Sequence, residues 1–110
     1  MQWNPYWKRI VFVPMDRIGD AVSDTPALAF LHTLQVEVIV LATQYTAPIF
    51  KYNPHVFQVV IYARSRRDGF ITARRVNRKA ANELAALQPD AVLGMMRPIR
   101  ELRDIYTTLK

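Results

Sequence analysis

The chain has 110 residues, of which 51% are hydrophobic, and this is enough to form one domain with an apolar core. It contains no cysteine, which excludes disulfides and thiolate metal sites and fits a reducing, cytoplasmic environment. The two histidines, His32 and His55, are too far apart in sequence to predict a metal site. The longest apolar runs are much shorter than the ~20 residues of a membrane-spanning helix, and the segment from Met1 to Arg9 lacks a signal-peptide core.

The charge is unevenly distributed. Fifteen lysines and arginines against nine acidic residues give a formal net charge of +6, and most of the excess lies between Arg64 and Lys79. A local basic patch of this kind predicts an anionic partner, such as phosphate, nucleic acid or a lipid headgroup.

The start of the chain is aromatic, with Trp3, Tyr6 and Trp7 before Lys8 and Arg9. These residues could lie at a membrane interface beside anionic lipid. Because the segment is too short for an amphipathic helix, we favour the alternative that the aromatic side chains cover the edge of a sheet.

The first predicted strand runs from Arg9 to Pro14, a continuous apolar run typical of parallel strands buried on both faces. Because Thr25 suits the N-cap position and Pro26 the first helical position, the pattern predicts a helix from about residue 26 to residue 34. In the alternative, this helix begins at Gly19 or Asp20 and kinks at Pro26. The residues expected to face inward are Ala27, Leu28, Leu31 and Leu34.

The rest of the chain repeats this alternation. Strands are predicted at residues 36–41, 56–62 and 91–96, and helices at 44–52, 71–87 and from 98 to the end, with a polar, basic loop at 63–69. The inward positions of the last two helices are Ala73, Val76, Ala80, Leu84, Leu87, Ile99, Leu102, Tyr106 and Leu109.

Four strands that alternate with helices predict an α/β fold, a Rossmann-like parallel sheet of four βα units with right-handed crossovers. By analogy with doubly wound sheets, the expected strand order is 3-2-1-4. This order leaves the strand at 91–96 on an edge, where it has no lysine or internal proline. We therefore expect the chain to self-associate in isolation.

The turn after the first strand carries a recognisable motif, Arg17-Ile18-Gly19-Asp20, followed after three residues by Asp24-Thr25-Pro26-Ala27-Leu28. It resembles the opening motif of the ADP-heptose:lipopolysaccharide heptosyltransferase family, which is family 9 of the glycosyltransferases. The resemblance continues through Asn53-Pro54-His55-Val56 and the basic segment after the third strand, and so covers most of the chain.

The resemblance implies a GT-B architecture, in which an amino-terminal Rossmann-like domain binds the acceptor and a carboxyl-terminal one binds the nucleotide sugar. Residues 1–110 would be part of the amino-terminal domain, with the second domain absent. The implied reaction is inverting transfer of a sugar, heptose from an ADP-sugar, to a lipopolysaccharide core or related anionic glycolipid. No cofactor is implied, the chain alone would be inactive, and peripheral contact with the cytoplasmic face of the inner membrane fits these substrates.

Inverting transfer needs a base that takes a proton from the acceptor hydroxyl, and a carboxylate in a cleft can do this. Asp20 matches the base proposed for the family, although on spacing alone an aspartate here is more often a helix cap. Gly19 would let the backbone approach the sugar and adopt a turn conformation that other residues resist. Arg17 is either an acceptor contact or a partner of nearby carboxylates. Asp16 and Asp24 are expected to face solvent or to cap; in the alternative, either one raises the basicity of Asp20 through like-charge repulsion.

Arginines follow the third strand, at the same edge of the sheet as the Asp20 turn. Guanidinium groups bind phosphate and carboxylate bidentately, so these side chains are candidates to hold an anionic acceptor. The candidate acceptor-binding residues are Arg17, Gly19, Thr25, Arg64, Arg66, Arg67 and Arg74, with Arg75 beside them. Arg78 and Lys79 lie further along the helix and are expected to form a solvated face.

Two other functions fit the sequence. A small nucleic-acid-binding module is suggested by the positive charge and by Tyr62 and Phe70, which flank the arginines and could stack on bases. No recognised nucleic-acid motif accompanies these residues, so we rank this function lower. The third possibility is a non-catalytic α/β remnant that serves as an interaction domain.

Overall fold

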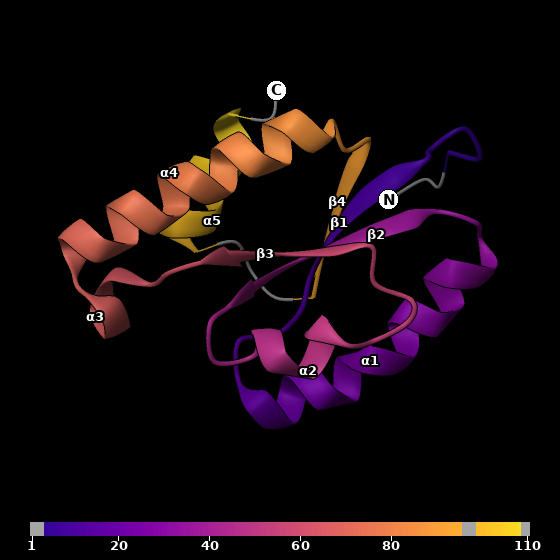
Figure 1. The fold of residues 1–110 in the computed structure, drawn as a ribbon, viewed down its shortest axis with the longest axis horizontal. Coiled ribbons are helices and arrows are strands. Elements are labelled where there is room, and N and C mark those ends of the chain that lie inside the picture. The colour runs from indigo at the N-terminus through magenta and orange to yellow at the C-terminus, as the bar shows by residue number, and fades with distance from the viewer. Residues whose placement is uncertain (1–3, 96–98, 109–110) are drawn as a thin grey trace.

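In the computed structural model, which describes residues 4–95 and 99–108, four parallel strands form one sheet in the order β3-β2-β1-β4 (Figure 1). The strands are β1 (Arg9–Val13), β2 (Glu37–Thr43), β3 (Gln58–Tyr62) and β4 (Ala91–Gly94). The helices are α1 (Ile18–Thr33), α2 (Ala47–Lys51), α3 (Ser65–Asp68), α4 (Phe70–Leu87) and α5 (Arg100–Thr108). The predicted Rossmann-like class and strand order are confirmed.

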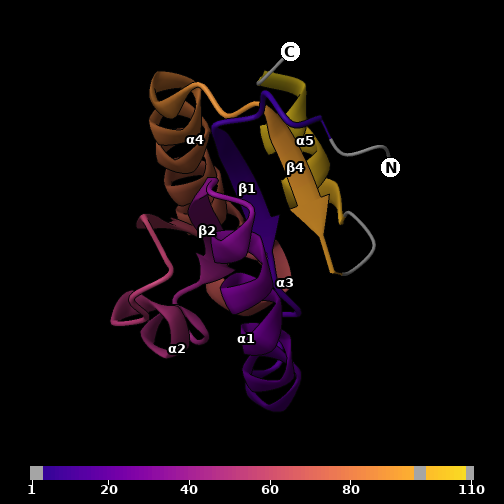
Figure 2. The same cartoon turned by 90° about the vertical axis from the view of Figure 1, so that its right-hand side faces the viewer.

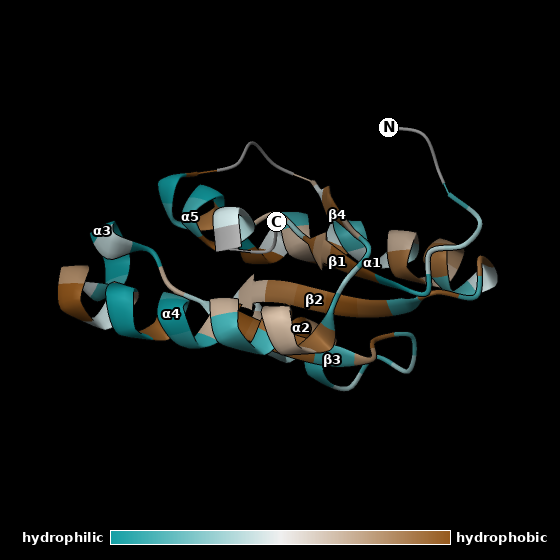
Figure 3. Cartoon of the chain, turned by 90° about the horizontal axis from the view of Figure 1, so that it is seen from above, coloured by the Kyte–Doolittle hydropathy of each residue, from teal (hydrophilic) through white to brown (hydrophobic). Residues whose placement is uncertain are grey.

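Helices cover both faces of the sheet, α4 and α5 on one side and α1 and α2 on the other (Figure 2). Val11 and Val13 of β1 belong to the core beneath α4 and α5, whereas Ile10 and Phe12 belong to the core beneath α1 and α2. Because both faces of β1 are covered, its sequence is continuously apolar. In Figure 3 the strands are mostly brown, whereas the helices carry both teal and brown residues.

Helix α1 begins at Ile18, well before the predicted start at Pro26, so the main prediction for this helix is wrong and the alternative with an early start is close. Pro26 lies inside the helix, where it has no N–H to donate to the carbonyl of Val22. The Thr25 hydroxyl donates to that carbonyl instead, at 2.7 Å. Thr25 is therefore not the N-cap, and its hydroxyl satisfies a backbone group that the proline leaves free.

The other predicted elements exist with shifted ends. β2 continues to Thr43, which shortens the helix predicted at 44–52 to α2, and the strand predicted at 56–62 begins at Gln58. β3 begins later than predicted because a turn precedes it, in which Asn53 Oδ1 accepts a hydrogen bond from His55 N. The loop predicted at 63–69 contains α3, and β4 ends at Gly94, while residue 96 lies outside the described residues.

Most of the predicted core is confirmed. The inward positions that are buried or partly buried are Ala27, Leu28, Leu31, Ala73, Val76, Ala80, Leu84, Leu87, Ile99, Leu102 and Tyr106. The prediction is wrong for Leu34, which is 38% exposed because α1 ends at Thr33. Leu109 lies outside the described residues.

The aromatic segment at the start of the chain is only partly packed. Trp7 lies against the core on the α1 side, as expected for a residue that covers the sheet, but Tyr6 is 86% exposed. Trp3 lies outside the described residues. Within residues 4–95 and 99–108, none of the helices is both long enough and apolar enough to span a bilayer.

Candidate functional site

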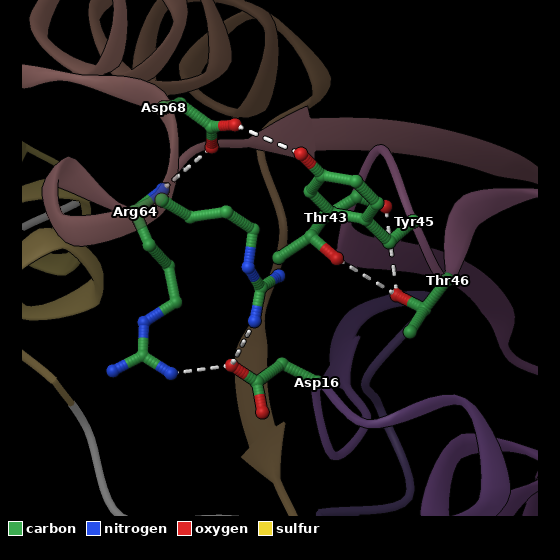
Figure 4. A network of polar contacts seen from close by, with 7 residues as sticks. Asp16, Thr43, Tyr45, Thr46, Arg64 and Asp68 are labelled. Carbon is green, nitrogen blue, oxygen red and sulfur yellow. Dashed lines mark hydrogen bonds and ion pairs between the residues drawn. The ribbon is translucent and has the colours of Figure 1, made fainter.

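Asp16 is the centre of a charged cluster at the carboxyl edge of the sheet. It follows β1, and its carboxylate pairs with two arginines that follow β3 (Figure 4). Arg64 donates a hydrogen bond from Nη1 to Asp16 Oδ2, and Arg67 Nη2 lies 3.9 Å from the same oxygen. The Asp16 side chain is only 12% exposed, so the expectation that it faces solvent or caps the helix is wrong. The parallel sheet brings these distant residues to one edge.

Asp68 fixes the short helix α3 that carries the arginines. Its Oδ2 accepts a hydrogen bond from the backbone N of Arg64 at 3.3 Å, and its Oδ1 accepts bonds from the Tyr45 hydroxyl at 3.4 Å and from Gln44 Nε2 at 3.3 Å. The guanidinium of Arg67 lies over the Tyr45 ring, 4.8 Å from its centroid. These contacts tie the loop after β2 to the segment after β3.

Asn77 of α4 holds the chain where β3 ends. Its Oδ1 accepts a hydrogen bond from Ala63 N at 2.7 Å, and its Nδ2 donates to the Ala63 carbonyl at 3.0 Å. The neighbouring Tyr62 hydroxyl is buried and has no hydrogen-bond partner among the described residues. Burial, with a smaller contribution from the Asp16 carboxylate, raises the pKa of Tyr62 far above its ordinary value. The hydrogen bond to Asp16 raises the pKa of Arg64, so this guanidinium stays charged.

Asp20, the predicted base, lies in the first turn of α1, next to the same edge. Its side chain is exposed, and within the described residues its carboxylate has no hydrogen bond or ion pair. The residue at the N-cap, Arg17, makes no side-chain cap, so the first N–H groups of α1 have no side-chain acceptor. Arg17 itself is exposed, and neither Asp16 nor Asp24 pairs with it in the part of the chain that the structure describes.

Gly19 and Asp24 shape the turn in different ways. Gly19 is helical rather than left-handed, and a Cβ built on it would meet no heavy atom within 4 Å. The prediction that the turn conformation needs glycine is therefore wrong, and open space lies beside this backbone. Asp24 Oδ2 accepts a hydrogen bond from Met15 N at 2.9 Å, which clamps the turn onto α1. This bond fits the expected backbone-capping role of Asp24.

The remaining predicted arginines do not all reach the Asp16 turn. Arg66 of α3 is exposed, and Arg74 lines a groove of about 510 Å³ between α4 and α5. Arg78 lines the same groove, as do the acidic side chains of Glu101 and Asp104. Lys79 Nζ lies 3.9 Å from Glu83 Oε1 in an exposed pair, as expected for a solvated face.

The fold also brings together the two histidines that are far apart in sequence. The ring centroids of His32 and His55 are 4.6 Å apart, and His55 Nδ1 is buried without a hydrogen-bond partner among the described residues. The pair lies near Glu37 at the start of β2, away from the carboxyl edge. In the described part of the chain, no group of three His, Cys, Asp or Glu side chains is arranged to hold a metal ion.

Among solved structures, the chain is similar to the crystal structure of the glycosyl transferase family 9 from Veillonella parvula DSM 2008. The match covers 100% of this chain and 31% of that chain, with a TM-score of 0.76 and 19% sequence identity. No family model matches the sequence, and no curated protein matches it. The chain therefore has the fold of part of a family 9 glycosyltransferase and spans about a third of its length.

Proposed function

We propose that the chain is the acceptor-binding part of an inverting glycosyltransferase, with Asp20 as the catalytic base. The observation that carries this proposal is the exposed Asp20 carboxylate at the carboxyl edge of a sheet that has the fold of the Veillonella parvula glycosyl transferase. Open α/β sheets bind their ligands at this edge.

In the proposed reaction, Asp20 takes the proton of the acceptor hydroxyl as that oxygen attacks the anomeric carbon of the donor sugar. Three features support this role. The carboxylate has no partner among the described residues, the first turn of α1 has N–H groups without a side-chain cap, and the space beside Gly19 is open. An acidic group of the acceptor would bind the N–H groups while its hydroxyl meets Asp20.

The arginines at the start of α3 and within it favour an acceptor that carries negative charge. Asp16 uses only part of the donor capacity of Arg64 and Arg67, because each guanidinium carries five N–H groups. The remaining donors, with those of Arg66, suit phosphate and carboxylate groups. Thr25 bonds within its own helix and Arg74 lines another groove, so we leave both outside this contact.

The substrates in the proposal follow from the resemblance to heptosyltransferases. The donor would be an ADP-sugar, with heptose as the transferred group, and the acceptor would be a lipopolysaccharide core or a related anionic glycolipid. Donor binding belongs to a nucleotide-sugar domain that is not part of residues 1–110. We therefore expect no sugar transfer by this chain alone.

The test uses a protein in which the chain is joined to its nucleotide-sugar domain. Asp20→Asn should lower kcat by about 10²-fold or more and change the acceptor KM little, because loss of a base affects the chemical step. Asp104→Asn, which removes an exposed carboxylate from α5, is the control and should leave kcat unchanged. Turnover of Asp20→Asn close to that of the unmodified enzyme would remove Asp20 from catalysis.

A further inference from the structure

Two large apolar side chains are exposed at the start of α4. Phe70 is 62% exposed and Ile71 is 74% exposed. They follow Gly69, whose φ of 88° turns the chain from α3 into α4. This corner lies at one end of the molecule, beyond the end of β3 (Figure 1), and the first turn of α4 is brown beside the teal of α3 in Figure 3. An apolar pair at such a projecting end is available to a partner.

Arginines share the side of α4 that carries this pair. Residues four apart lie on one side of a helix, so Phe70 aligns with Arg74 and Arg78, and Ile71 aligns with Arg75. The side that packs on the sheet is defined by Ala73, Ala80 and Leu84. Within the described residues, none of the three arginines forms an ion pair. Arg74 and Arg78 line the groove that also contains Glu101 and Asp104, whereas Arg75 lies outside that groove.

We propose that this α4 docking face, formed by Phe70, Ile71, Arg74, Arg75 and Arg78, binds the chain to an anionic membrane surface. The two apolar side chains enter the headgroup region, and the guanidinium groups contact lipid phosphates. The formal charge of +6 on the whole chain complements such a surface. Because two exposed side chains bury little area, the contact needs both its apolar and its charged part.

The structure favours a membrane over a nucleic acid as this partner. Proteins that bind single-stranded nucleic acids typically present several exposed aromatic rings on which successive bases stack. Of the two aromatic residues that flank the arginines, only Phe70 is exposed. Tyr62, one of the two aromatic residues that flank the arginines, is 1% exposed and packs in the core. Ile71 is exposed but aliphatic, and it suits acyl chains rather than bases. The docking face therefore has the composition of a membrane-surface helix.

The inference goes beyond the proposed function, because membrane binding does not require sugar transfer. The proposed acceptor-binding arginines and the docking face are neighbours, since α3 carries Arg66 and Arg67 and directly precedes α4 in the chain. A glycolipid acceptor held in the same membrane would lie near the Asp16 cluster.

The test is co-sedimentation of the purified chain with vesicles of phosphatidylcholine and phosphatidylglycerol at a ratio of about 7:3, compared with phosphatidylcholine alone. We expect binding to the anionic vesicles at low salt, and weaker binding at high salt because salt screens the charges. Phe70→Ser with Ile71→Ser should lower the binding constant at least about tenfold. Arg75→Gln with Arg78→Gln should lower it by about fivefold for each charge.

Matched control variants remove exposed apolar side chains and positive charges from parts of the surface outside the docking face. Phe30→Ser with Tyr52→Ser replaces side chains that are 64% and 84% exposed on the opposite side of the sheet. Lys8→Gln with Lys51→Gln removes two charges from exposed positions outside α4. Both control pairs should bind the vesicles nearly as well as the unmodified chain.

A second measurement does not depend on variants. Anionic vesicles should slow hydrogen exchange of the backbone amides of residues 65–78 in the unmodified chain. Equal losses of binding in the test and control pairs, or exchange without protection in this segment, would overturn the proposal. So would binding of single-stranded oligonucleotides by a chain that does not bind the vesicles.

Discussion

Asp16 and Asp20 are two carboxylates of one turn that the fold places in opposite environments. Asp16 is 12% exposed and is held by Arg64 and Arg67. Asp20 is exposed, and the described residues give it no partner. This contrast separates a carboxylate that maintains the edge of the sheet from one that is free to take part in a reaction.

The contrast predicts different effects on stability. Asp16→Asn should lower the free energy of unfolding by about 1–2 kcal/mol, because it leaves a half-buried arginine without its charged partner, an effect reduced by solvent screening. Asp20→Asn, the matched control, should change it by less than about 0.5 kcal/mol. Urea denaturation of both variants measures the difference. Equal destabilisation by the two substitutions would mean that Asp20 is structural as well.

At the scale of elements, Asp90 joins the beginning of β4 to that of β1. Its Oδ2 accepts hydrogen bonds from the backbone N of Lys8 at 2.7 Å and of Arg9 at 3.0 Å, and its own N donates to the Arg9 carbonyl at 2.7 Å. The two backbone donors lower the pKa of Asp90. Since the ionised form is favoured in the folded state, the stabilisation is present above about pH 4 and is lost as the pH falls through the lower, folded-state pKa.

Asp90→Ala should therefore lower the melting temperature at pH 7. In acid, the melting temperature of the unmodified chain should fall toward that of the variant, because Asp90 is then protonated and its stabilising contribution is lost. Thermal denaturation followed by circular dichroism between pH 7 and pH 2 measures both. Asp104→Ala, which removes an exposed carboxylate from α5, is the control and should melt close to the unmodified chain at pH 7. If the difference in melting temperature between Asp90→Ala and the unmodified chain stays the same down to pH 2, the ionised Asp90 carboxylate is not what stabilises the fold.

The elements differ in how far local sequence predicts them. The four strands are predictable because each is a short apolar run, and their order is the one expected by analogy with doubly wound sheets. The start of α1 cannot be predicted in the same way. Thr25 and Pro26 are residue types typical of the first positions of a helix, and yet both lie inside α1. The pairing of Asp16 with Arg64 is also beyond local prediction, since it joins residues 48 positions apart. The parallel topology predicts only that they share an edge.

The whole molecule has two exposed sheet edges, β3 and β4, among the described strands. β4 is short, and β1 pairs along one side of it. Among the described residues, no strand pairs with the other side of β4, and its backbone groups there are open to a second copy of the chain. Light scattering should therefore show association of the isolated chain that increases with concentration. A monomer at every concentration would contradict this prediction.

We propose that the carboxyl edge of the sheet, with Asp20 and the arginines after β3, binds the acceptor rather than the nucleotide sugar. Titration of the isotope-labelled chain with a phosphorylated, carboxylate-bearing monosaccharide tests it directly by NMR. We predict shifts confined to amides of residues 15–20 and 63–68, weakened by Arg66→Gln with Arg67→Gln and preserved in Lys8→Gln with Lys51→Gln. An ADP-sugar that shifts the same amides while the monosaccharide leaves them unchanged would contradict the claim.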